Sequence, residues 1–79
     1  MSNNAIISMS FEDLLNILDA RTTVTLFIDF KDGSKGDLVR NNKKVYELIN
    51  DEALMPLLRA KVIGLSHTLG VTSILIKEV

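Results

Sequence analysis

Acidic residues and glycines crowd one short stretch of the chain, "TLFIDFKDGSKGDL", at residues 25–38. Such residues build calcium loops, and glycine-rich loops cradle phosphates. A calcium loop places acids at alternate positions ahead of its glycine, but those positions before Gly33 hold Asp32, Phe30 and Ile28. A phosphate loop needs the spacing G-x-x-x-x-G-K-[ST] before a helix, which "GSKGDL" lacks. We therefore interpret the stretch as the turn of a β-hairpin.

The register of this predicted hairpin decides where its charges lie. A two-residue turn would set Ile28 opposite Asp37, whereas a three- or five-residue loop sets Ile28 opposite Leu38. Because the register follows the buried face, we expect the odd loop, with Gly33 or Gly36 at positive φ. Two like-charged pairs would then face each other, relieved by diagonal lysine–aspartate contacts: Asp29 with Asp37, and Lys31 with Lys35. Adventitious binding of a divalent cation to these acids is the alternative.

His67 is the only histidine and the first place to look for a catalytic base. Ser66 is its neighbour, but adjacent residues of a strand point to opposite faces, so the two side chains cannot form a dyad directly. With no cysteine in the chain, a zinc site has no ligand set either. We therefore predict a protein that is not an enzyme, with no catalytic residue, no metal site and no cofactor.

The basic cluster "RNNKK" supplies Arg40, Lys43 and Lys44. It is interpreted as a solvated turn, and contact with a nucleic-acid backbone or an acidic protein is the alternative. The chain as a whole has a formal net charge of -1, whereas DNA-binding and anionic-membrane-binding domains usually carry a basic footprint. Nucleic acid is therefore the less favoured partner.

The elements that would position these groups can be predicted from the apolar spacing. Ser10 is a helix cap, with Asp13 completing a box-like pair, and the helix should end near residues 19–20. Strands are expected over residues 22–30 and 37–40, and short helices near 43–50 and 52–59, with Pro56 in the opening turn of the second. Residues 61–67 and 73–79 form a second hairpin around Gly70.

This order, α-β-β-α-β-β, predicts a small α+β domain. Its sheet would have four strands, antiparallel or mixed, with the short helices on one face. A length of 79 residues allows one domain, residues 1–79, in which residues 1–9 form a flexible arm or an extra strand. We see no signal peptide and no membrane span, and the composition fits a cytoplasmic protein without membrane contacts.

Some apolar side chains remain after the predicted core has been filled. The candidate interaction surface consists of Phe27, Leu75, Val79, Ile6 and Ile7. If they cluster, the outer face of the sheet is half apolar, which indicates a homodimer or a protein partner. Alternatively, "AIISM" crosses that face as an extra strand or cover. Edge strands offer a second route to association, by strand addition.

The layout also resembles that of small uncharacterised proteins encoded by phages and prophages of Gram-positive bacteria. The resemblance lies in the order of "FEDLLNIL", "TTVTLFID", "YELI", "KVIGLS" and "SILIKEV" from Ser10 onward. It implies a non-enzymatic interaction protein that modulates or inhibits a host protein, for example in defence. The alternatives are a nucleic-acid-binding accessory protein and an oligomeric binder of a small molecule.

Overall fold

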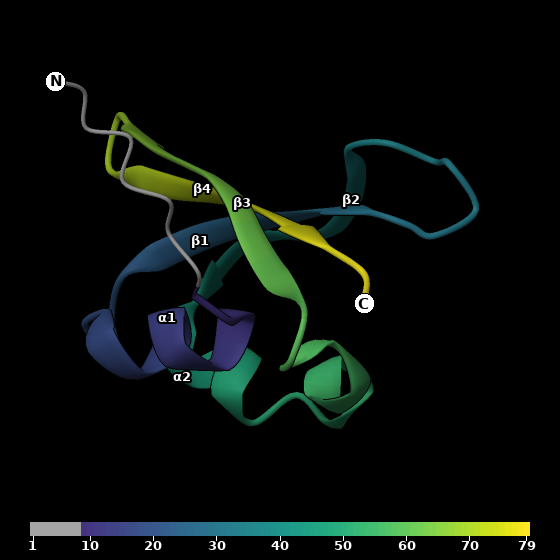
Figure 1. The fold of residues 1–79 in the computed structure, drawn as a ribbon. Helices are drawn as coiled ribbons and strands as arrows, with labels where there is room; N and C mark the ends of the chain where they lie inside the picture. The colour runs from purple at the N-terminus through teal and green to yellow at the C-terminus, as the bar shows by residue number, and fades with distance from the viewer. Residues whose placement is uncertain (1–8) are drawn as a thin grey trace, which may run out of the picture.

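Four strands and three short helical segments make up residues 9–79, the part of the chain that the computed structural model describes. In chain order they are α1 (Phe11–Ile17), β1 (Thr23–Asp29), β2 (Asp37–Lys44), α2 (Val45–Ile49), the 3-10 helix η1 (Glu52–Leu57), β3 (Lys61–Thr68) and β4 (Val71–Lys77). The strands form one sheet in the order β2-β1-β4-β3, with the helical segments on one side of it (Figure 1). The predicted α+β class and element order are confirmed.

The sheet is mixed. β1 and β2 pair antiparallel, as do β3 and β4, and each pair is a hairpin. The two hairpins join through β1 and β4, which run parallel with Thr23 beside Val71 and Asp29 beside Lys77. The two central strands are therefore far apart in the sequence, with β2, α2, η1 and β3 between them.

Helix α1 begins where its cap was predicted. The Asp13 backbone N–H donates to the Ser10 hydroxyl oxygen at 3.1 Å, so a donor at the helix N-terminus is satisfied. The helix ends at Ile17, earlier than predicted, because Leu18 is already extended. A turn follows in which the Arg21 N–H donates to the Asp19 carboxylate at 2.8 Å. The helix is short, and its buried face holds it against the sheet.

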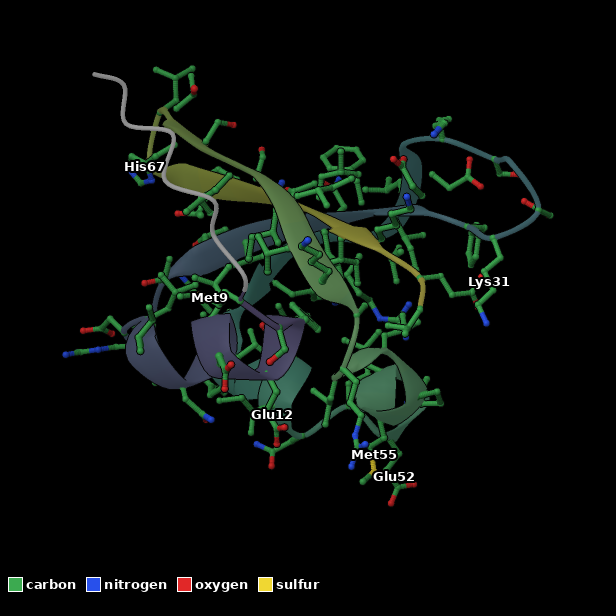
Figure 2. All side chains as sticks on the ribbon, viewed as in Figure 1. Met9, Glu12, Lys31, Glu52, Met55 and His67 are labelled. Carbon is green, nitrogen blue, oxygen red and sulfur yellow. The ribbon has the colours of Figure 1, made fainter. Side chains whose placement is uncertain are left out.

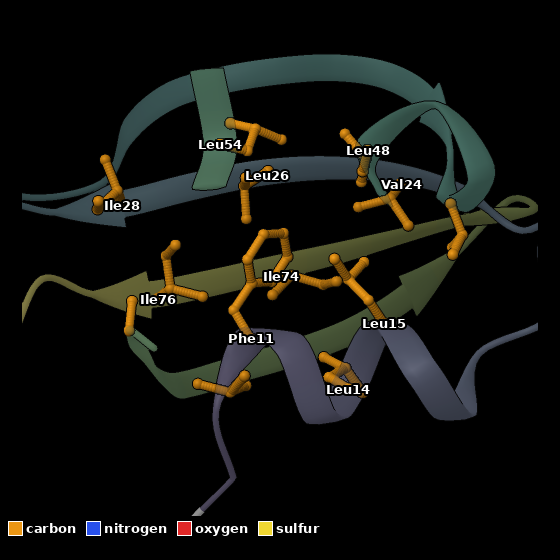
Figure 3. Close-up of a cluster of buried hydrophobic side chains, with 13 residues drawn as sticks. Phe11, Leu14, Leu15, Val24, Leu26, Ile28, Leu48, Leu54, Ile74 and Ile76 are labelled. Atoms are coloured by element: carbon orange, nitrogen blue, oxygen red, sulfur yellow. The ribbon is translucent and has the colours of Figure 1, made fainter. Parts of the chain in front are cut away.

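The core lies between the helical layer and one face of the sheet (Figure 3). Alternate residues of the central strands point into it, as the period of a strand requires. The fully buried side chains of these two strands are Val24, Leu26, Ile28, Ile74 and Ile76. From the helical layer they meet Phe11, Leu14, Leu15, Val45, Leu48 and Leu54.

The predicted register of the first hairpin is wrong. Ile28 pairs with Asp37, and Phe27 pairs with Leu38, so Leu38 lies on the open face and is 57% exposed. Asp29 therefore does not pair with Asp37, and Lys31 and Lys35 lie in the loop over residues 30–36. The odd loop predicts that Ile28 and Leu38 share the core face. Instead, two register shifts farther along the hairpin change which residues of β2 lie opposite those of β1.

The second half of the chain departs from prediction in two smaller ways. Pro56 lies inside η1 rather than in its opening turn, and the helix begins with the Ala53 N–H donating to the Asp51 carboxylate at 3.0 Å. The turn between β3 and β4 is only Leu69 and Gly70, at φ values of 53° and 79°. Such two-residue turns with positive φ match the twist of a hairpin.

None of the helices described over residues 9–79 is long and apolar enough to cross a membrane.

Candidate interaction surfaces

The open face of the sheet carries an apolar row that crosses its strands. Leu38 of β2 pairs with Phe27 of β1, Phe27 with Leu75 of β4, and Leu75 with Gly64 of β3. Leu38 is exposed, and Phe27 and Leu75 are half-buried. A Cβ built on Gly64 would lie 3.2 Å from the Leu75 Cβ, so Leu75 packs closely over the bare backbone there. We call Leu38, Phe27 and Leu75 the open-face row.

Polar residues border the open-face row on both sides. Thr25 and Ser73 pair next to it, and Ser73 pairs in turn with Ser66. On the other side Asp29 pairs with Lys77. An apolar centre with a polar rim is the usual layout of a protein-docking patch.

The predicted interaction residues are thus brought together in part. Phe27 and Leu75 are direct neighbours in the open-face row. Val79 follows the end of β4 and is 71% exposed. Ile6 and Ile7 lie outside the described residues.

A second apolar surface, which the sequence did not reveal, lies between α1 and the outer edge of β3. A cleft of about 460 Å³ opens there, lined by Met9, Leu14, Ile17, Lys61, Val62, Ile63, Gly64 and Leu65. Ile17, Ile63 and Leu65 are 68%, 43% and 54% exposed, so much of this lining faces solvent. Two of the lining residues are hydrogen-bonded to each other, since the Val62 N–H donates to the Met9 carbonyl at 2.9 Å. We call this site the α1–β3 cleft.

The predicted basic patch is not a free cationic surface. The Arg40 Nε donates to the Asp51 carboxylate at 2.8 Å, and this hydrogen bond lowers the pKa of Asp51. The Lys44 ammonium donates to the Thr23 hydroxyl oxygen at 2.7 Å. Of the three predicted cations only Lys43 is exposed, whereas Arg40 and Lys44 are half-buried. All three residues belong to β2 rather than to a turn. The patch is therefore a weak platform for a phosphate backbone.

The acids of the first hairpin satisfy their own loop. The Asp29 carboxylate accepts the Gly36 N–H at 2.7 Å. The Asp32 carboxylate accepts the Ser34 N–H at 2.9 Å, and this bond lowers the pKa of Asp32. Gly33 and Gly36 both take positive φ, which only glycine adopts without strain. These contacts agree with a structural turn.

His67 and Ser66 lie on opposite faces of β3, as predicted from their adjacency. Ser66 pairs with Ser73 on the open face, whereas His67 pairs with Thr72, and the His67 Nδ1 is 3.0 Å from the Thr72 hydroxyl. His67 lies near the β3–β4 turn, at the end of the sheet away from Lys31 in the first hairpin loop (Figure 2). Within residues 9–79 no three His, Cys, Asp or Glu side chains gather closely enough to hold a metal ion.

Comparison of the chain with protein-family models, with curated proteins and with solved structures finds no match.

Proposed function

We propose that this protein is a non-enzymatic interaction module that binds another protein through the open face of its sheet. The observation that carries the proposal is the open-face row, in which Leu38, Phe27 and Leu75 stand side by side on three strands. No described helix covers this row, because the helical layer packs on the opposite face. Apolar side chains arranged in this way lose water when a partner docks, which favours binding.

The biological role that we propose is modulation of a host protein in the cytoplasm of a Gram-positive bacterium. Its support is the resemblance to small phage and prophage proteins in the order of elements. Inhibition of a defence enzyme is one form of this role, since a small rigid sheet face can occlude a surface without doing chemistry. The net charge of -1 argues against an inhibitor that mimics the charge of DNA.

The test is a tagged pull-down from a Gram-positive bacterial lysate at low and at high salt, with the eluted proteins identified. Leu38→Lys disrupts the open-face row, and Met55→Lys on η1 is the matched control, since the two side chains are 57% and 62% exposed. Met55 lies on the helical side of the molecule (Figure 2). We expect one stoichiometric protein that survives high salt with the wild type and Met55→Lys, and is lost with Leu38→Lys.

Other results of the pull-down would overturn the proposal. Retention of nucleic acid alone, released by salt, would favour the nucleic-acid-binding alternative. A partner that binds wild type and Leu38→Lys equally would place docking elsewhere. Circular dichroism of both variants shows that loss of binding is not loss of fold.

A small-molecule role is the second candidate, and the α1–β3 cleft favours it. Its volume of about 460 Å³ is that of a pocket for a small ligand, and its lining is mainly apolar. A ligand that binds only the folded state raises the melting temperature. A thermal-shift screen of apolar compounds tests this role, and Leu65→Lys, which places a charge in the cleft lining, should abolish any shift.

A further inference from the structure

Beyond Val62, no strand within residues 9–79 covers the outer edge of β3, so this edge is a candidate for strand addition. β3 is the last strand in the sheet order, and within residues 9–79 its outer side is met only at the start, by the Ser10–Lys61 bridge and the Met9 carbonyl. From Ile63 to Thr68 no described strand pairs with that edge. Unpaired edge groups are a template for another strand, and Ser10 already forms an antiparallel bridge to this edge at Lys61.

This edge also lacks the features that usually prevent such pairing. No Asp, Glu, Lys, Arg or Pro occurs from Val62 to Ser73. Ile63 and Leu65 are exposed, and small residues, Gly64 and Ser66, alternate with them. The one register shift of β3 lies at its start, between Val62 and Gly64. An exposed apolar edge without charges is a strong candidate for pairing.

The turn after β3 adds an independent observation. Leu69 has a φ of 53°, a left-handed conformation that leucine adopts at a cost of about 1–2 kcal/mol. Its side chain is 96% exposed, so burial against residues 9–79 does not offset that cost. A turn residue of this kind is unfavourable for the isolated chain and becomes favourable if the leucine is buried by a partner.

We infer that the outer edge of β3 pairs antiparallel with β3 of a second copy, about a two-fold axis at Ser66. This register sets Ser66 opposite Ser66, Leu65 opposite His67 and Ile63 opposite Leu69. It starts beyond Lys61 and Val62, so the Ser10 bridge stays in place. The interface is self-complementary, as a two-fold interface must be, and no like charges oppose each other.

The same register explains the α1–β3 cleft. Leu65 pairs with the buried Ile74, so its side chain lies on the helical side of the sheet. Because side chains alternate along a strand, His67 and Leu69 lie on the same side. Ile63 is part of the cleft lining. Leu69 of the second copy, opposite Ile63, therefore enters the cleft between β3 and Ile17 of α1. Each copy fills the cleft of the other, and the two sheets become one continuous sheet.

In this dimer Leu69 is buried on the helical side of the joint sheet, whereas the open-face row lies on the opposite face and has Ser66 only at its polar border. The inference does not rest on the proposed function, and either can fail without the other. A monomeric variant that still retains the host protein would separate them in one experiment.

The decisive test uses the two-fold axis itself. Sedimentation equilibrium of the full chain should give a dimer, and both Ser66→Glu and Ser66→Lys should weaken it by roughly tenfold or more, because each opposes two like charges. An equimolar mixture of the two variants should recover the dimer, because opposite charges then face each other. Only a residue that opposes itself behaves in this way.

A matched control lies on the other edge of the sheet. Asn41→Glu on β2 is also an exposed polar residue of an edge strand, and it should leave the dimer intact. A wild-type chain that stays monomeric at all concentrations would overturn the inference. So would a dimer that survives Ser66→Glu, or variants that fail to rescue each other. Circular dichroism shows that both Ser66 variants remain folded.

Discussion

The two edge strands of the sheet differ in nearly every property that controls pairing. β2 carries Arg40, Lys43 and Lys44, two register shifts against β1, and Asn42 at a φ of 51°. β3 has one register shift, and Lys61 at its start is its one charged residue. Charges and bulges are the usual means of keeping an edge single. The difference indicates that β2 is built to end the sheet and β3 to extend it.

The two edges also differ in how they are held to the rest of the molecule. β2 is fixed largely by polar contacts, among them Arg40 with Asp51 and the Asn42 N–H with the Thr25 hydroxyl at 3.3 Å. β3 contributes Val62, which is 5% exposed, to the core beside Ile76. Buried side chains should therefore contribute more to the free energy of unfolding at β3, and charged side chains more at β2.

The largest expected effect comes from a matched pair of valines. Val62→Ala should lower the free energy of unfolding by about 2 kcal/mol, because it removes buried methyl groups and leaves a void. Val39→Ala on β2 should cost less than about 1 kcal/mol, because Val39 is only half-buried. Urea unfolding at protein concentrations too low for dimerisation measures both losses. Equal losses would contradict the proposed difference between the edges.

A smaller effect is expected at the two described non-glycine residues with positive φ. Leu69→Asn should stabilise the unpaired monomer by up to about 1 kcal/mol, because asparagine tolerates this conformation and the Leu69 side chain buries nothing there. Asn42→Leu, the reverse exchange on β2, should destabilise it by a similar amount. Thermal unfolding at low protein concentration checks both. In the dimer Leu69→Asn should instead weaken association, and a variant that strengthened it would argue against burial of Leu69.

The smallest effect is a pH dependence at the β2 edge. The hydrogen bond from Arg40 lowers the pKa of Asp51 in the folded protein below its ordinary value of 3.8. The ionised Asp51 carboxylate therefore stabilises the folded protein above pH 4, and this stabilisation is lost as the pH falls through the lowered pKa. Asp51→Asn keeps an acceptor for the Ala53 N–H and removes the ion pair. The difference in melting temperature between wild type and variant should shrink below about pH 4. A difference unchanged at low pH would exclude the ion pair as its source.

Local patterns in the sequence predicted the elements well. Ser10 caps α1 as expected, and the alternation in Val24, Leu26 and Ile28 marked the buried face of β1. Helices on one face followed from the same apolar spacing. These features depend on neighbours in the chain, whose geometry is set by the period of each element.

The features that were missed depend on contacts between distant residues. One of the two register shifts of β2 lies at Thr25, whose hydroxyl accepts the Asn42 N–H across the hairpin. The paired asparagines Asn41 and Asn42 were the available signal, since asparagine tolerates positive φ. The parallel pairing of β1 with β4 has no local signature. The α1–β3 cleft was missed for the same reason, because it forms only when the sheet order places β3 beside α1.

The parallel pairing of β1 with β4 has a consequence for biosynthesis. On one side β1 pairs with β2, which follows it in the chain, but on the other side it pairs with β4, which is translated after β2 and β3, as the pairing of Thr23 with Val71 shows. Until β4 has been synthesised, the edge of β1 that faces it has no partner strand. Pairing between strands so distant in sequence also slows folding relative to a chain of local contacts. A nascent chain stalled before β4 should therefore be prone to aggregation and a target for chaperones.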